Sequence, residues 1–362
     1  MKKYNWYYLV LILIAVSSCK DKEDTAIGTD FDKSAFLTNA ADNIIVPAYE
    51  EALSKAEELK AATASFDANV TDASLTNLQE KWKLAFIAWQ GASPFNFGPA
   101  ENGSFKTIHE DIATFPINAT LIEQYISAAD NSLDNFDRDS RGFAGIDYMI
   151  NKGTNTEVLA SFDANRRAYL TAVVKDIVDR IENVHTLWTG SYRDEFVSNT
   201  TTSAGGSISK YYNQFLISYE GNKSYKLALP TGLGAGQTSV QPELLEAYYG
   251  EISLELVKAH FTVIENIWYG KSASGTNGSG FDDYLDAVAG GSELKEQTIT
   301  SLANVWAKIN AIPLGSLTST LNSDPSTVET TVEEMQKHTR YFKSDLSTKI
   351  GIAVTFSDGD GD

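Results

Sequence analysis

The chain has 362 residues, of which 43% are apolar, so it can bury the core of one large or two medium-sized globular domains. Its 48 Asp and Glu side chains outnumber 29 Lys and Arg side chains, and the formal charge of −19 argues against nucleic acid as a partner. The single cysteine, Cys19, excludes an internal disulfide framework and a cysteine-based zinc site.

The first eighteen residues are typical of a secretory signal peptide. Lys2 and Lys3 precede an apolar stretch over residues 6–16, which is too short to span a membrane. The stretch ends in Val16-Ser17-Ser18-Cys19, which resembles a bacterial lipobox, where cleavage precedes a cysteine that then receives lipid. The sequence therefore predicts a signal peptide over residues 1–18 and a lipid on Cys19 that anchors the chain to the bacterial outer membrane.

A polar and acidic segment follows the predicted lipidation site. Residues 19–33 show no apolar periodicity, so we expect a flexible linker between lipid and fold. Within it, Lys20-Asp21-Lys22-Glu23-Asp24 resembles the charged export signals of some surface lipoproteins, and an ordinary solvated tether is the alternative. The sequence leaves open whether the chain lies on the periplasmic face or on the cell surface.

Beyond the linker, apolar side chains recur every three or four residues, the spacing that buries one stripe of a helix. In the N-terminal half these stripes run through residues 37–59, 75–89 and 162–188, and in the C-terminal half through residues 208–219, 244–268, 294–309 and 325–350. Only residues 352–356 alternate like a short strand. The chain is therefore predicted to be all-α.

A polar stretch over residues 198–206 is the best candidate for a boundary between domains. We found no repeat at a fixed period of 20–50 residues, which argues against a solenoid. Helices of this length with short connections favour helical bundles. We therefore expect an N-terminal bundle over residues 34–197 and a C-terminal bundle over residues 207–362.

Several segments, taken in this order, resemble the imelysin family. They are Pro47-x-Tyr49, the segments 82–89 and 94–99, Phe115-Pro116, and the segments 141–148, 226–230, 246–249 and 280–285. The resemblance covers roughly residues 40–362. It implies two helical bundles related by a degenerate internal duplication, with a functional site near their junction, in a family of lipid-anchored or periplasmic proteins that is classed with the metallopeptidases and linked to iron uptake.

The hallmark of the family is the motif G-x-H-x-x-E on a helix, where residues three apart lie on one face and could ligate the same cation. The matching positions are Gly142, Ala144 and Asp147, so the imidazole is replaced by a methyl group and the Glu by a shorter Asp. A second family position, a Glu two residues before the first Phe of an F-x-F-G loop, is Ser93 here. A standard zinc site cannot form from this motif, and no catalytic residue is predicted.

The resemblance places a candidate binding site around Asp147 and the loop that follows Ser93. Phe95 and Phe97 in this loop either close over a small ligand or plug the end of the bundle, and we favour the plug. His109 could supply a replacement ligand if it lies near Asp147. A weakly bound iron, zinc or calcium ion remains open, and the sequence does not say which.

Two other histidines are expected to have no special role. His260 lies five residues from both Glu255 and Glu265, on a different face of its helix, and is expected to be solvated. Glu334 and His338 are four residues apart and are expected to form an exposed surface pair.

The leading hypothesis is a non-enzymatic binding or accessory protein of the bacterial envelope, associated with iron acquisition. Its expected partners are the membrane, through the lipid on Cys19, and a protein of an envelope uptake system. A degenerate metallopeptidase is the first alternative. The second is a structural protein that docks a partner through exposed aromatic side chains.

Overall fold

The computed structural model describes residues 31–101, 107–133, 135–313 and 315–356. The predicted signal peptide and Cys19 lie outside these residues, as does most of the predicted linker. The described chain is helical, and its strand-like pairs are two isolated bridges, Glu101 with Thr107 and Lys271 with Asn277. The all-α prediction is confirmed. None of the described helices is both long and apolar enough to cross a membrane.

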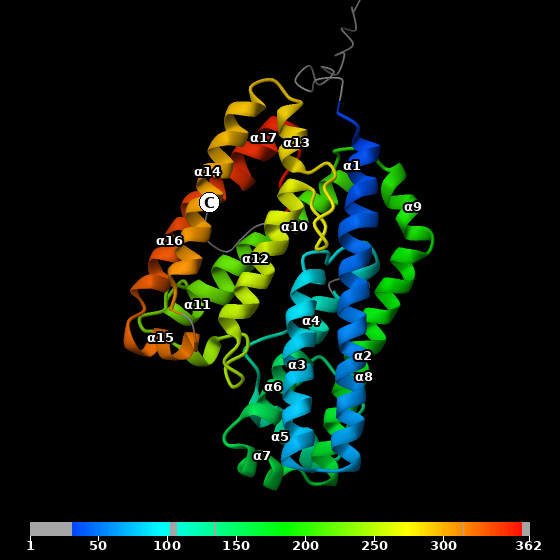
Figure 1. The fold of residues 1–362 in the computed structure, drawn as a ribbon, viewed down its shortest axis with the longest axis vertical. Coiled ribbons are helices and arrows are strands. Elements are labelled where there is room, and N and C mark those ends of the chain that lie inside the picture. The colour runs from blue at the N-terminus through cyan, green and yellow to red at the C-terminus, as the bar shows by residue number, and fades with distance from the viewer. Residues whose placement is uncertain (1–30, 102–106, 134, 314, 357–362) are drawn as a thin grey trace, which may run out of the picture.

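The N-terminal half is built around three long helices, α2, α3 and α8, which lie side by side in Figure 1, where α2 contacts both of the others. Its elements are α1 (Lys33–Asn39), η1 (Ala40–Ile45), α2 (Val46–Ala68), α3 (Asp72–Ala92), η2 (Gly98–Ala100), α4 (Ile108–Ile112), α5 (Ala119–Ala128), η3 (Arg138–Ser140), α6 (Gly142–Asn151), α7 (Asn155–Ser161), α8 (Ala164–Thr189) and α9 (Ser191–Ser198).

The C-terminal half pairs α10 with α12 and α14 with α16, in the upper left of Figure 1. Its elements are α10 (Ser207–Lys223), η4 (Ser224–Ala228), α11 (Leu229–Thr231), η5 (Pro242–Leu244), α12 (Ser253–Tyr269), α13 (Phe281–Asp286), α14 (Gly291–Ala311), α15 (Leu317–Ser323), α16 (Ser326–Arg340), η6 (Tyr341–Leu346) and α17 (Ser347–Ile350).

Helix α3 illustrates how the sequence specifies these elements. The Thr71 hydroxyl accepts a hydrogen bond from the Ser74 amide and begins the helix with a capping box. The apolar stripe then buries one face, which includes Leu75, Trp82 and Trp89. The same helix contacts α12, so it also joins the two halves.

Both halves open on a helix that contains a π-turn just before a proline. Segment η1 precedes Pro47 and segment η4 precedes Pro230. A proline inside a helix donates no hydrogen bond and its ring crowds the carbonyl four residues earlier, and a wider turn relieves this conflict. In the second half that carbonyl belongs to Lys226. The similarity agrees with an internal duplication, which stays a prediction.

Residues 199–206 connect α9 to α10, at the position where we expect the domain boundary. One cluster of buried apolar side chains nevertheless extends through both halves. The division into two domains therefore remains a prediction. Residues 352–356, which alternate like a strand, form none; there the Asn213 side chain donates a hydrogen bond to the Ala353 carbonyl at 3.1 Å and accepts one from the Thr355 amide at 2.7 Å.

Candidate functional site

A pocket of about 260 Å³ opens where the two halves meet. We call it the junction pocket. Helix α6 and the segment before α5 contribute one part of its lining, and residues 243–249 of the C-terminal half contribute the other. The lining residues are Phe115, Pro116, Ile117, Ala119, Ala144, Asp147, Glu243, Leu244, Leu245, Glu246, Tyr248 and Tyr249.

Gly142 brings the start of α6 into place. Its φ is +73°, and a Cβ at this position would lie 2.3 Å from the Ile112 carbonyl oxygen. Only glycine adopts this conformation and permits this approach without strain. The first residue of the hallmark motif is therefore explained by the backbone, and the other two matching positions, Ala144 and Asp147, both line the junction pocket.

Asp147 is buried, with 1% of its surface exposed. Its Oδ1 accepts a hydrogen bond from Asn151 at 2.9 Å and its Oδ2 accepts one from the Tyr249 amide at 3.0 Å. Burial raises the pKa of Asp147 to about 7, although these hydrogen bonds act in the opposite direction. Asp147 forms no ion pair with any residue that the structure describes, so none of these side chains compensates its charge.

The segment that faces Asp147 approaches closely because it contains Gly250. A Cβ on Gly250 would lie 2.6 Å from the Trp82 ring and 2.8 Å from the Asp147 Oδ1. Any larger residue would push the C-terminal half away from α6. The Tyr249 amide could then no longer reach the carboxylate.

Behind the pocket lies a buried network that we call the central polar cluster, formed by Gln90, Lys226, Glu246 and His260. The Lys226 ammonium lies 2.8 Å from Glu246 Oε2 and donates a hydrogen bond to the Gln90 side-chain oxygen. The Gln90 amide in turn donates to Glu246 Oε1 at 3.2 Å. Glu246 thus belongs both to this cluster and to the lining of the pocket.

His260 completes the central polar cluster and is 4% exposed, so the expectation that it is solvated was wrong. Its Nδ1 lies 3.1 Å from the Gln90 side-chain oxygen and its Nε2 lies 2.6 Å from the Ser218 hydroxyl. Burial lowers the pKa of His260 well below its ordinary value, and the charge of Lys226 adds to this effect. The imidazole is therefore neutral at neutral pH.

The other predicted site residues lie outside the lining of the junction pocket. The Ser93 hydroxyl is 3.3 Å from His260 Nδ1, at the edge of the central polar cluster. His109 stacks on Trp89 with 6.2 Å between ring centroids. Burial lowers the pKa of His109 to about 4, and the charge of Lys226 contributes. His109 is thus a neutral, partly buried ring.

Phe95 and Phe97 are buried in an aromatic core, which is the position expected for a plug. Phe97 packs edge-on against Trp188 at 5.7 Å, and Phe95 lies 6.3 Å from Tyr211. Neither ring is among the lining residues of the junction pocket. The reason is that the loop after Ser93 turns its rings toward α8 and α10.

The expectation of an exposed pair at Glu334 and His338 was also wrong. His338 is fully buried, and its Nδ1 lies 2.9 Å from the Ser301 hydroxyl on α14. Glu334 pairs instead with Lys337 at 3.1 Å. Spacing along one helix cannot reveal a partner on another helix, and for this reason both histidines were misjudged.

The hallmark positions do not fit a tightly held transition metal. Ala144 offers no donor atom, and Asp147 is the single carboxylate at the hallmark positions, fewer than the three or four protein ligands of a zinc site. Across the described ranges no group of three His, Cys, Asp or Glu side chains is arranged to hold a metal ion.

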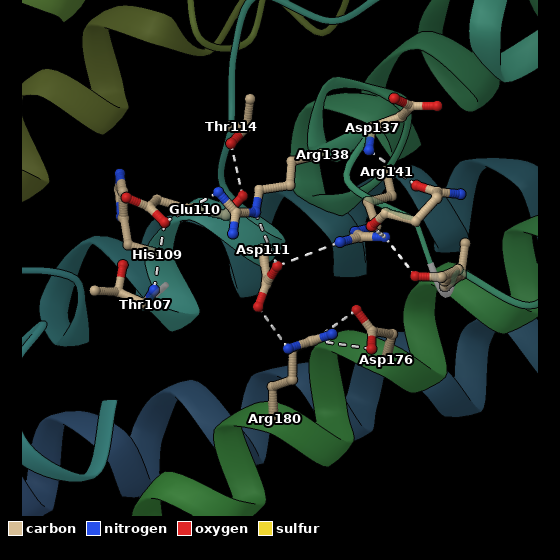
Figure 2. Close-up of polar contacts among 12 residues, drawn as sticks. Thr107, His109, Glu110, Asp111, Thr114, Asp137, Arg138, Arg141, Asp176 and Arg180 are labelled. Carbon is tan, nitrogen blue, oxygen red and sulfur yellow. Dashed lines mark hydrogen bonds and ion pairs between the residues drawn. The ribbon is translucent and has the colours of Figure 1, made fainter. Parts of the chain in front are cut away.

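One side of the pocket is supported by a further buried carboxylate, Asp111 of α4. Figure 2 shows three guanidinium groups around it. Its oxygens lie 3.2 Å from Arg138, 3.2 Å from Arg141 and 2.7 Å from Arg180. These ion pairs tie α4 to α8 and to the segment before α6. The pocket residues that follow α4 are thereby held against the N-terminal bundle.

Comparison with known proteins agrees with the landmark residues. Residues 45–343 match the family model of imelysin, peptidase M75. The iron-regulated protein A of Synechococcus elongatus is 20% identical over 286 residues, which are 75% of this chain and 76% of that protein.

Two solved structures share the fold. An iron-regulated protein A-like precursor from Parabacteroides distasonis superposes with a TM-score of 0.72 at 18% identity, over 88% of this chain and 95% of that chain. An imelysin-like protein from Psychrobacter arcticum superposes with a TM-score of 0.71 at 21% identity, over 91% of this chain and 99% of that chain. Since the family model covers most of its length, this chain belongs to the imelysin family.

Proposed function

We propose that this chain is a lipid-anchored binding or accessory protein of the bacterial envelope, that it takes part in the acquisition of iron or another metal, and that it does not hydrolyse peptides. The lipid anchor is supported by the lipobox-like residues that end at Cys19. The link to iron is supported by the relatives that are named iron-regulated protein A. The junction pocket is the proposed binding site.

The observation that carries the absence of peptidase activity is the donor set at the hallmark positions. Catalytic zinc requires about three protein ligands and one open position for water. Ala144 supplies no ligand, which leaves Asp147 as the single carboxylate that the hallmark positions provide.

The peptidase question can be settled with an unfolded protein substrate such as reduced casein. The purified chain is incubated with the substrate and with zinc, iron or calcium, with and without a chelator. We expect no hydrolysis above that of the buffer in any arm. Hydrolysis that the chelator stops and that Asp147→Ala abolishes would refute the proposal and show a working metallopeptidase.

The anchor is tested by cell fractionation and by metabolic labelling with a fatty acid. We expect the wild-type chain to be labelled and to sediment with membranes. The lipid must provide this attachment, because the protein is acidic and several acyl chains together make a durable anchor. Cys19→Ser should be unlabelled and released. An unlabelled wild-type chain would contradict the lipid anchor.

The role in metal acquisition is tested in cells that lack the chain. Under iron limitation we expect these cells to take up radioactive iron more slowly than the parent, and the wild-type chain to restore the rate. The Asp147→Asn chain, with a changed pocket, should fail to restore it. Equal uptake with and without the chain, for iron and for zinc, would remove the acquisition role.

A further inference from the structure

The lining of the junction pocket combines carboxylates with aromatic rings. The carboxylates are Asp147, Glu243 and Glu246, and the rings are Phe115, Tyr248 and Tyr249. None of the lining residues is a lysine or an arginine. Carboxylates and π faces both attract positive charge, and aromatic faces contribute most when the cation is desolvated.

The carboxylates of the pocket differ in how their charge is balanced. Glu246 pairs with Lys226 of the central polar cluster at 2.8 Å. Asp147 is 1% exposed and has hydrogen bonds but no ion pair within the described part of the chain. A buried carboxylate without a cation is costly.

Asp111 provides the comparison within the same fold. It is about as deeply buried as Asp147, with 5% of its surface exposed, yet three arginines surround it. The described residues thus provide cations for Asp111, whereas they provide none for Asp147, which lines a pocket. A ligand can supply the missing charge.

The size of the pocket limits what that ligand can be. The volume is about 260 Å³, which is below the range of pockets that enclose drug-sized molecules. The small side chain of Ala144 leaves room where the family motif has an imidazole. The space suits a short alkyl chain that ends in a charged group.

We propose that the junction pocket binds an organic cation, an alkylammonium or guanidinium group, which pairs with Asp147 and lies among the rings of Phe115, Tyr248 and Tyr249. The inference rests on the proposed binding function of the pocket and names the chemistry of its ligand. A metal ion would need further donor atoms at Ala144, whereas an organic cation needs one counter-charge and apolar contact.

The test is titration calorimetry on the purified full chain at about pH 8, where Asp147 is mostly charged. The probes are n-butylammonium and agmatine, with n-butanol as the neutral isostere and butyrate as the anion. We expect both free cations to bind and n-butanol and butyrate not to bind.

Two variants and one control separate pocket chemistry from general charge. Asp147→Asn should weaken n-butylammonium binding at least tenfold, and Ala144→Leu should weaken it by filling the space without a change of charge. Asp194→Asn removes the same charge from a side chain that is 82% exposed on α9, and it should leave the affinity unchanged. Circular dichroism establishes that each variant is folded.

These measurements distinguish a pocket that does not bind an organic cation from a chain that lacks the proposed binding function. Equal affinity for n-butanol and n-butylammonium, or an Asp147→Asn variant with wild-type affinity, would overturn the organic cation. A third outcome is that zinc, iron or calcium binds, that n-butylammonium does not bind, and that Asp147→Asn abolishes metal binding. This outcome would overturn the organic cation but leave the proposed binding function of the pocket intact. Chelator-sensitive peptide hydrolysis would instead overturn the proposed function.

Discussion

At the scale of single residues, Asp147 makes the stability of the fold depend on pH. Burial raises its pKa from an ordinary value of 3.8 to about 7, so between these values the native state holds a proton that the unfolded chain releases. Protonation therefore stabilises the fold at low pH, and this contribution, on the order of 4 kcal/mol, is lost as the pH rises toward neutrality.

We predict that the stability of the wild-type chain and that of Asp147→Asn depend differently on pH. Between about pH 4 and about pH 7 the free energy of unfolding of the wild-type chain should fall more steeply than that of Asp147→Asn, whose amide does not titrate. Urea denaturation at several pH values measures both slopes. Asp194→Asn gives the effect of removing one surface charge. Parallel curves for the wild type and Asp147→Asn would show that this carboxyl does not titrate in the window.

Asp111 stabilises the fold through its ion pairs with three arginines. Asp111→Asn leaves the buried guanidinium of Arg141, which is 3% exposed, without its carboxylate. Removing one partner of a buried ion pair costs about 3–5 kcal/mol. Asp176→Asn is the matched control, since this side chain is 22% exposed and pairs with Arg180 at 2.8 Å. It should cost about 1 kcal/mol or less.

Urea denaturation of both variants checks this prediction. An equal loss of stability in Asp111→Asn and Asp176→Asn would mean that the arginines around Asp111 find other partners. In that case the ion pairs shown in Figure 2 would not be what holds α4 in place.

At the scale of elements, the helices could be predicted but their mutual contacts could not. The apolar stripes of α3 and α8 are buried as expected, because periodicity is a local property of the sequence. The burial of Lys226 depends on segments far apart in the chain. Gln90 lies on α3, and Glu246 follows η5.

The same contrast applies to the candidate site. The resemblance marked Gly142, Ala144 and Asp147, and two of these line the junction pocket. It also marked the segments that contain Lys226 and Glu246, but nothing in the sequence pairs these two residues. The sequence signal for a buried charge at this place was a lysine in an otherwise apolar stretch of helix. Burial of His260 and His338 had no signal of this kind, since their partners lie on other helices.

The ion pair of Lys226 with Glu246 should behave as a unit. Lys226→Met leaves Glu246 charged and buried without a cation, which we expect to cost about 3–5 kcal/mol. The double variant Lys226→Met/Glu246→Gln removes both charges. Its loss of stability should be smaller than the summed losses of the single variants Lys226→Met and Glu246→Gln. Urea denaturation of the four proteins gives the coupling. Additive effects would show that the pair is not coupled.

At the scale of the whole molecule, the two halves are expected to unfold together. One apolar cluster extends through both, α3 contacts α12, and the central polar cluster joins Gln90 of the N-terminal half to Lys226 of the C-terminal half. Opening the junction would expose the buried ammonium and carboxylate together with apolar surface. We therefore predict a single cooperative transition, although the chain is long enough for two domains.

The tryptophans allow the two halves to be followed separately. Trp82, Trp89 and Trp188 belong to the N-terminal half, and Trp268 and Trp306 belong to the C-terminal half. In a variant with Trp268→Phe and Trp306→Phe, fluorescence reports mainly on the N-terminal half, while circular dichroism reports on all helices. The two urea transitions should coincide. If the transition followed by fluorescence and the transition followed by circular dichroism have different midpoints, the halves are independent domains. In that case a ligand in the junction pocket should bring the two midpoints together, because it binds only when the halves are joined.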